Sequence, residues 1–388
     1  MKPIALTYHY KFLTLGFLFL LNTANAQWKN EIFNPDPEQE FKSSRGLQFK
    51  KPLQLGLLQY TKDNEYFQPN SPGETFFGQR IWAIGELESA RENQPLTIRL
   101  GLSIQFPFQQ QVYQKLAAYP IVQLEYHGKK SMIQAGNIDA HVQHNLPDPV
   151  ISYDYALSNP VEYGLNWRSK HKYWDWNSWL NWRQLAVTTT SQQEIISFGN
   201  RGNWQIVNQK NLQLNLPVYA MMYHKGGEDL AIPKNIQNKL STGAGFQLSL
   251  IPQKWFLEIW KGFSNDFSPQ RNQPFRNGDY WLFSATKQLS YNHRIQFNYF
   301  QGTEFHSPLG NPLFGSVNLN NPYKSMPLNN LLFARYSYNK KLNSNQSKGN
   351  AILEFRFEPI FKIPENEFLF NIGLYLKYTL GGKIAYQP

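Results

Sequence analysis

The chain has 388 residues, no cysteine, and a formal charge of +11 from 38 basic and 27 acidic residues. The lack of cysteine excludes a disulfide scaffold, a cysteine-ligated metal site and an acylated lipoprotein. Aromatic residues make up 16% of the chain, and together with abundant amides they fit an exported β-protein better than a nucleic-acid-binding domain.

Residues 1–26 read as a secretory signal. Lys2 and Lys11 precede an apolar run over 12–21, and the small-residue exit Ala24-Asn25-Ala26 follows. We therefore predict a signal peptide over 1–26, a periplasmic N-terminal segment over 27–46 and a barrel over 47–388.

The clearest later segments alternate strictly between apolar and polar residues. They are 96–106, 212–222 and 368–380, and a period of two predicts β-strands with one apolar and one polar face. Strands of soluble proteins usually have about 5–6 residues, whereas a tilted membrane-spanning strand needs about 9–11. The length of these segments favours membrane-spanning strands over a soluble β-sandwich, which stays open as an alternative.

Sixteen segments carry strand patterns, and long polar connections mostly alternate with tight ones. Long connections are expected at 61–75, 107–119, 139–160, 224–241, 262–279 and 302–330. Strands are expected at 47–60, 76–87, 96–106, 120–127, 131–138, 161–168, 174–187, 193–208, 212–223, 242–250, 254–261, 280–288, 293–301, 331–338, 350–358 and 368–380. The alternation of long and tight connections is typical of barrels with extended outer loops and short periplasmic turns. The sequence therefore predicts an all-β protein, a transmembrane antiparallel up-and-down β-barrel of about 16 strands (14–18).

Aromatic residues cluster near the ends of these strands, as in the girdles that barrels place at the membrane interfaces. We expect such a girdle from Trp174, Trp176, Trp182, Trp255 and Trp281. General strand preference for aromatics and a carbohydrate-stacking surface are the alternatives.

The last strand carries Asn371, Gly373, Leu376 and Tyr378 at the spacing polar-x-Gly-x-x-apolar-x-aromatic. This pattern resembles the assembly signal of bacterial outer-membrane barrels, although Asn stands where Lys or Gln is preferred and ten residues follow. The whole layout resembles a porin-like outer-membrane β-barrel protein of Gram-negative bacteria. The resemblance implies an outer-membrane location, contact with outer-membrane lipid, and the barrel-assembly machinery as a partner.

Several charged residues lie opposite the apolar strand faces and are expected to line the lumen, where charge rings bias ion passage. Candidate pore-lining residues are Arg99, Glu125, Arg168, Arg356 and Lys377. The segment 139–160 is Pro-rich and is expected to fold inward as a constriction or to form an ordinary surface loop. Its candidate residues are Asp139, His141, His144 and Asp148, for which a metal site is a weaker alternative.

Contiguous motifs for nucleophilic, nucleotide-dependent or zinc chemistry are absent. Because His293 and Ser307 fall in unrelated connections, a Ser-His lipid hydrolase is the weakest hypothesis. The sequence therefore predicts a channel for passive diffusion of small polar solutes, with no cofactor, no nucleic-acid partner and no enzymatic activity. A non-transporting barrel that binds surface glycan or scaffolds envelope proteins is the alternative, and a homo-oligomer or an envelope partner remains open.

Overall fold

The computed structural model describes residues 32, 46–68, 71–90, 96–108, 116–138, 143–187, 192–227, 235–270, 273–318, 325–342 and 349–380. The predicted signal peptide lies outside the described residues, as do Asp139 and His141.

Sixteen strands make up nearly all the regular structure of the described part. They are β1 (Gly46–Gln68), β2 (Ser71–Ala90), β3 (Leu96–Pro107), β4 (Ala117–His127), β5 (Ser131–Ile138), β6 (Glu162–Lys170), β7 (Trp174–Gln184), β8 (Ile195–Asn208), β9 (Leu212–Lys225), β10 (Gln237–Leu250), β11 (Trp255–Asp266), β12 (Asn277–Gln288), β13 (His293–Thr303), β14 (Leu328–Lys341), β15 (Asn350–Lys362) and β16 (Glu367–Leu380).

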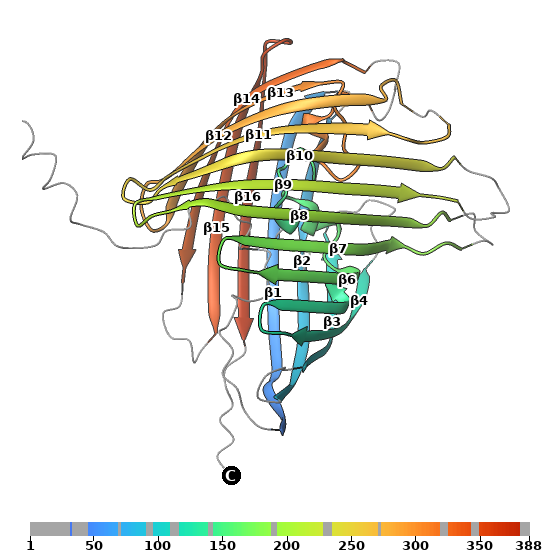
Figure 1. The fold of residues 1–388 in the computed structure, drawn as a ribbon, viewed down its shortest axis with the longest axis vertical. Coiled ribbons are helices and arrows are strands. Elements are labelled where there is room, and N and C mark those ends of the chain that lie inside the picture. Colours follow the sequence, from blue (N-terminus) through green and yellow to red (C-terminus); the bar gives the residue numbers. More distant parts are fainter. Residues whose placement is uncertain are drawn as a thin grey trace, which may run out of the picture.

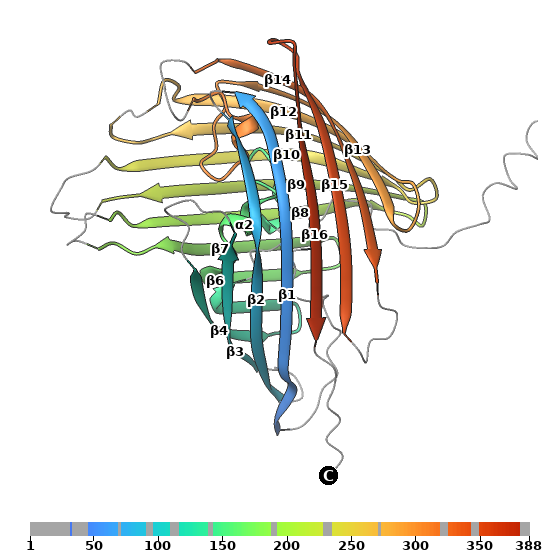
Figure 2. The same cartoon turned by 180° about the vertical axis from the view of Figure 1, so that it is seen from behind.

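The strands pair in sequence order, every pair is antiparallel, and β16 pairs with β1 to close the barrel. This confirms the predicted up-and-down barrel and its strand number. In Figure 1 the strands β6–β13 run across the view while β1, β2, β15 and β16 run along it, so the closed sheet is strongly twisted. Figure 2 shows β1 beside β16 at the closure. We call the end where β1 begins and β16 ends the inner end, and the opposite end the outer end.

The two faces of the sheet have the chemistry expected of a membrane barrel. Outward-facing apolar side chains are exposed, for example Leu100 (50%), Val122 (57%) and Leu165 (54%). Their inward-facing strand neighbours, such as Glu125, Asn166 and Gln123, are buried. The alternation in the sequence therefore gives the barrel an apolar outer surface and places polar side chains on its inner face.

One expected connection is wrong. The segment 61–75 was predicted as a long loop, but β1 continues to Gln68 and β2 begins at Ser71. Asp63 pairs with Thr75 and Asn64 with Glu74 in this extension of the hairpin. Both faces are polar here, so the alternation that identifies a strand is lost although the backbone pairing continues.

The helical pieces are short and lie in two connections. These are the 3-10 turn η2 (Gln143–Asn145), the helix α2 (Tyr155–Ser158) and the 3-10 turn η4 (Pro312–Phe314). Among the described residues, no helix has the length and apolar character needed to cross a membrane. The two connections start at the outer end and fold back against the inner wall of the barrel, and we call their described parts, 143–161 and 304–318, the inserted loops.

Candidate functional site

The inserted loops meet each other inside the barrel. Ile151 and Leu309 form a parallel bridge, and the Ser152 N–H donates to the Leu309 carbonyl over 2.8 Å. The Ser307 hydroxyl donates to the Val150 carbonyl over 2.8 Å. Val150, Ile151 and Leu309 are buried in one cluster with inward-facing rings of the wall. The two loops therefore form a single packed body within the lumen.

Buried charges attach this body to the wall. Arg335 of β14 donates to Asp148 over 3.2 Å and also pairs with Glu358 of β15, and all three side chains are buried. Lys62 of β1 pairs with Asp154. Asp148 and Asp154 thus each have a wall partner of opposite sign, as buried charges require.

His144 is part of the same attachment. Its Nε2 lies 3.0 Å from Glu162, and its ring stacks on Trp179 with 3.8 Å between centroids. His144 is 1% exposed. Its ring is therefore enclosed by Glu162 and Trp179 and is not open to the lumen. The described residues contain no cluster of His, Asp and Glu suited to a metal ion.

The predicted pore-lining residues all lie on the inward face. Arg99 donates to Glu86 over 2.8 Å and to Glu125 over 3.2 Å. Arg356 pairs with Glu354, and Lys377 is 5% exposed. Arg168 lies on the same face of β6 as the buried Asn166 and Glu162. Opposite charges thus pair along the wall within the described part of the lumen.

The predicted aromatic girdle faces outward. Trp182 and Trp281 lie toward the outer end, while Trp174, Trp176 and Trp255 lie at the inner ends of β7 and β11. Trp179 and Trp260, in the same stretches, face inward and are buried. Of the assembly pattern, Asn371 and Gly373 face inward, and Leu376 and Tyr378 lie on the opposite face. Asn371 donates to Tyr66 over 3.0 Å.

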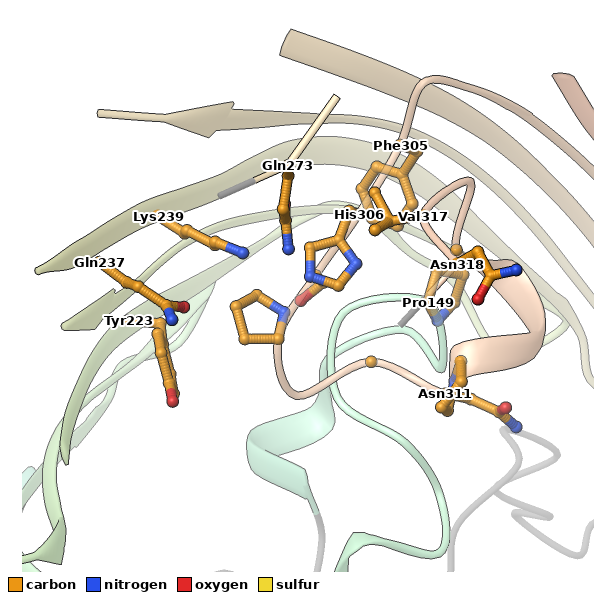
Figure 3. A pocket seen from close by; sticks show the side chains of 15 residues that line it. Pro149, Tyr223, Gln237, Lys239, Gln273, Phe305, His306, Asn311, Val317 and Asn318 are labelled. Atoms are coloured by element: carbon orange, nitrogen blue, oxygen red, sulfur yellow. The ribbon is translucent and has the colours of Figure 1, made fainter. Parts of the chain in front are cut away.

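A pocket of about 300 Å³ lies between the second inserted loop and the outer ends of β9 and β10. Figure 3 shows Lys239 and Gln273 directed toward the ring of His306. His306 has some surface exposed, and desolvation by burial together with the charge of Lys239 lowers the pKa of His306 to about 3. The imidazole is therefore neutral at pH 7.

A hydroxyl and a carboxylate meet on the outward face at the outer end. The Thr75 hydroxyl of β2 donates to Asp63 of β1 over 2.7 Å, and Thr75 is exposed. Ile372 (39% exposed) faces Asp63 directly across the pairing of β1 with β16, and Phe77 (42%) and Leu374 (50%) lie one step further toward the middle of the strands. The pair thus lies near the outer end among exposed apolar side chains, which continue on β16 to Phe368 (59% exposed). We call Thr75 and Asp63 the outer-rim pair.

The histidines are distributed unevenly with respect to this rim. His127, His171 and His293 lie at the inner end, and His293 contacts the Tyr336 hydroxyl over 2.7 Å. His293 and Ser307 therefore lie far apart along the barrel and do not form a Ser-His pair. His224 is the histidine of the described residues on the outward face at the outer end, where its Nδ1 lies 2.6 Å from Asn238.

Sequence reasoning missed the outer-rim pair, because its two residues fall within the expected loop 61–75. Strand pairing across the turn brings them together, and no contiguous motif records that contact. A carboxylate and a hydroxyl placed symmetrically about the Gln68–Ser71 turn would have been the available signal.

Comparison with known proteins gives a family and a fold. The family model described as Lipid A 3′-O-deacylase-type matches residues 41–384. The solved structure of Pseudomonas aeruginosa OccD3 (OpdP) aligns with a TM-score of 0.53 and 8% identity, over 92% of this chain and 99% of that chain. P. aeruginosa OccK9 (OpdG) gives 0.53 and 10%, over 86% and 99%. P. aeruginosa OprD gives 0.52 and 10%, over 87% and 97%. No curated protein matches the chain.

These likenesses confirm the fold of a porin-like outer-membrane barrel. The prediction that the chain is not an enzyme is wrong, because the matching family is one of deacylases. The error has a physical cause: antiparallel strands bring reactive groups together across a sheet, so a search for contiguous motifs does not detect them.

Proposed function

We propose that this barrel is an outer-membrane hydrolase, starting from the fact that the chain belongs to the lipid A 3′-O-deacylase-type family. The family description names removal of an acyl chain from an oxygen of lipid A. We infer the same class of reaction here, the hydrolysis of an acyl ester in a glycolipid of the outer leaflet.

The observation that carries this proposal is the contact between Thr75 and Asp63 beside exposed apolar side chains near the outer end. An ester between a fatty acid and a sugar lies at the boundary between the apolar acyl chains and the polar headgroups. Thr75 and Asp63 lie on the outward face near the outer end, directly beside the exposed side chains of Phe77 and Ile372. A lipid lying against β1 and β2 would bring its ester to the height of these two side chains.

The geometry of the pair suits nucleophilic catalysis. A nucleophile and its base are expected within about 2.6–3.2 Å of each other, and the Thr75 Oγ1 to Asp63 Oδ1 distance is 2.7 Å. Asp63 takes the hydroxyl proton while Thr75 Oγ1 attacks the ester carbonyl carbon. The bond from that carbon to the sugar oxygen breaks, and the proton passes to this oxygen. Water then releases the acyl chain from Thr75 as a fatty acid, and its proton restores the hydroxyl.

The test is the rate of acyl release from lipid A by the full mature chain in vesicles, with variants at the rim. Thr75→Val removes the hydroxyl at nearly constant shape, and Asp63→Asn removes the base. Each is expected to lower the rate about a hundredfold or more, the usual contribution of such a group. Thr75→Ser keeps a hydroxyl and is expected to retain activity.

Thr61→Val is the matched control, because Thr61 lies two residues from Asp63 on the same outward face of β1 and is exposed. Full activity of Thr75→Val would contradict the assignment. If His224→Gln lost activity while Thr75→Val kept full activity, the catalytic site would instead be assigned to the outer ends of β9 and β10.

Passage of small polar solutes is a second candidate function. It is favoured by the polar inward face of a closed sixteen-strand barrel, a strand number that in other barrels encloses an aqueous channel unless loops fill it. In this proposal the inserted loops, with His144 and Asp148, are the constriction, and Arg99, Glu125, Arg168, Arg356 and Lys377 line the path. A variant that loosens the inserted loops tests this proposal, because it should increase the passage of solutes through the barrel.

Both candidates need export and insertion. We propose that residues 1–26 direct the chain out of the cytoplasm, and that Asn371, Gly373, Leu376 and Tyr378 present the last strand to the barrel-assembly machinery. The outer end then faces the cell exterior, since an even number of strands returns the chain to the side on which it began.

A further inference from the structure

The pocket at His306 contains a buried cation that makes no ion pair with a described residue. Lys239 is 7% exposed, and Figure 3 shows its amine directed into the pocket. Within the described residues, no hydrogen bond or ion pair holds this amine. Burial of an unpaired ammonium costs far more than burial of a paired one, so the position calls for an anion.

The surroundings of the amine strengthen this argument. Among the described residues that line the pocket there is no Asp and no Glu. Asp266 stands opposite Lys239 in the pairing of β10 with β11 but forms no ion pair with it, and its charge acts on Lys239 together with the opposing charge of Lys225. Asp266 itself accepts the Ser268 N–H over 2.9 Å and lies outside the lining. The field inside the pocket therefore favours a negative ligand.

Neutral donors surround the cation. His306 lies opposite Lys239, and within the described part its imidazole has no hydrogen-bond partner, while its backbone N–H donates to Ser264 over 3.3 Å. Gln273 and Gln237 add side-chain amides to the lining. Several donors around one positive charge match a group with at least three acceptor oxygens, as a phosphate has.

We propose that this pocket binds the phosphate group of a small phosphomonoester, with Lys239 supplying the charge and His306 and Gln273 supplying hydrogen bonds. The volume of about 300 Å³ is at the lower end for small-molecule sites, so it suits a phosphate with a small substituent. The site is independent of the proposed hydrolysis, since it lies on the inward side of β9 and β10, whereas the outer-rim pair lies on the outward face of β1 and β2.

The test is isothermal titration calorimetry of the full mature chain in detergent with inorganic phosphate and with glucose 1-phosphate. Saturable binding is expected, at least tenfold weaker in Lys239→Met and weaker in His306→Gln, and retained in Lys239→Arg. Lys287→Met is the control, because it removes the same charge from an exposed position at the inner end of β12. Heat-dependent mobility on gels verifies that each variant is folded.

Two further arms identify the source of the phosphate. Binding of glucose 1-phosphate without binding of phosphatidylcholine nanodiscs containing phosphatidic acid supports a soluble ligand, and the reverse supports a lipid headgroup. The proposal is overturned if acetate binds as tightly as phosphate or if no titrant gives saturable heat. It is also overturned if folded Lys239→Met binds phosphate as tightly as the wild type, or if folded Lys239→Arg loses binding.

Discussion

Arg335 connects two acidic side chains that come from different parts of the chain. It pairs with Glu358 on the neighbouring strand and with Asp148 on the first inserted loop, and all three are buried. Two carboxylates share one guanidinium, so the group carries an excess negative charge when all are ionised. Burial raises the pKa of Asp148 to about 6, against the opposing effect of Arg335.

The stability of the barrel should therefore depend on Asp148 in a defined pH window. The pKa of Asp148 in the fold, about 6, lies above its ordinary value of 3.8, so the folded state binds this proton more tightly than the unfolded chain does. Between about pH 4 and pH 6 the contribution of this group to stability falls as pH rises. In Asp148→Asn that pH-dependent part is lost, so the variant gains stability relative to the wild type from pH 4 to pH 7.

Urea unfolding in detergent, followed by tryptophan fluorescence at several pH values, measures this difference. Arg335→Met is expected to destabilise by about 3–5 kcal/mol, because it leaves buried acids without their cation. Asp279→Asn breaks a part-exposed ion pair with Lys261 and is the control, with an expected change of about 1 kcal/mol or less. Parallel pH curves for the wild type and Asp148→Asn would contradict the role given to Asp148.

At the residue scale, the sequence pattern predicts whether a side chain points into or out of the barrel better than it predicts which residue that side chain contacts. Alternation places Arg99, Glu125 and Lys377 on the polar face, and the structure has them there. Their ion pairs and the contact between Thr75 and Asp63 depend on cross-strand register, which alternation does not specify. The attachment of Asp148 to Arg335 spans 187 positions, and no local pattern reports it.

The inserted loops are the elements on which any passage through the barrel depends. The two loops approach each other closely at Gly310, where a Cβ atom would lie 2.0 Å from the carbonyl oxygen of Pro149. At Gly315, in the same loop, the nearest atom to a Cβ would be the Pro312 oxygen at 3.3 Å. Glycine is thus required at Gly310 for the two loops to touch.

Gly310→Ala should force the loops apart and increase the passage of ions. We expect larger single-channel currents in a planar bilayer than for the wild type, because a Cβ at position 310 would push the second inserted loop away from Pro149. Gly315→Ala is the matched control and should leave the current nearly unchanged. Equal currents in the wild type and Gly310→Ala, with both proteins shown to be inserted, would mean that this contact does not close the lumen.

At the element scale, strands were predictable wherever one face is apolar. The segments 96–106, 212–222 and 368–380 alternate strictly and lie within β3, β9 and β16. The outer extension of β1 and β2 was missed, because beyond the apolar band Lys62, Asp63 and Glu74 make both faces polar. Backbone pairing continues there without a hydrophobic signature.

The whole molecule combines a porin-like fold with the sequence family of a deacylase. The fold follows from strand number and alternation, and it could be predicted from the sequence. The enzymatic family could not, because barrels with the same fold can differ in a few side chains on one face. We propose the outer-rim pair as such a difference.

The most direct measurement is mass spectrometry of lipid A after incubation with the folded mature protein in vesicles. We predict that the lipid loses the mass of one acyl chain, that a free hydroxyl replaces the ester, and that Thr75→Val leaves the lipid intact. Unchanged lipid A in the presence of folded, inserted wild-type protein would contradict the proposed hydrolysis.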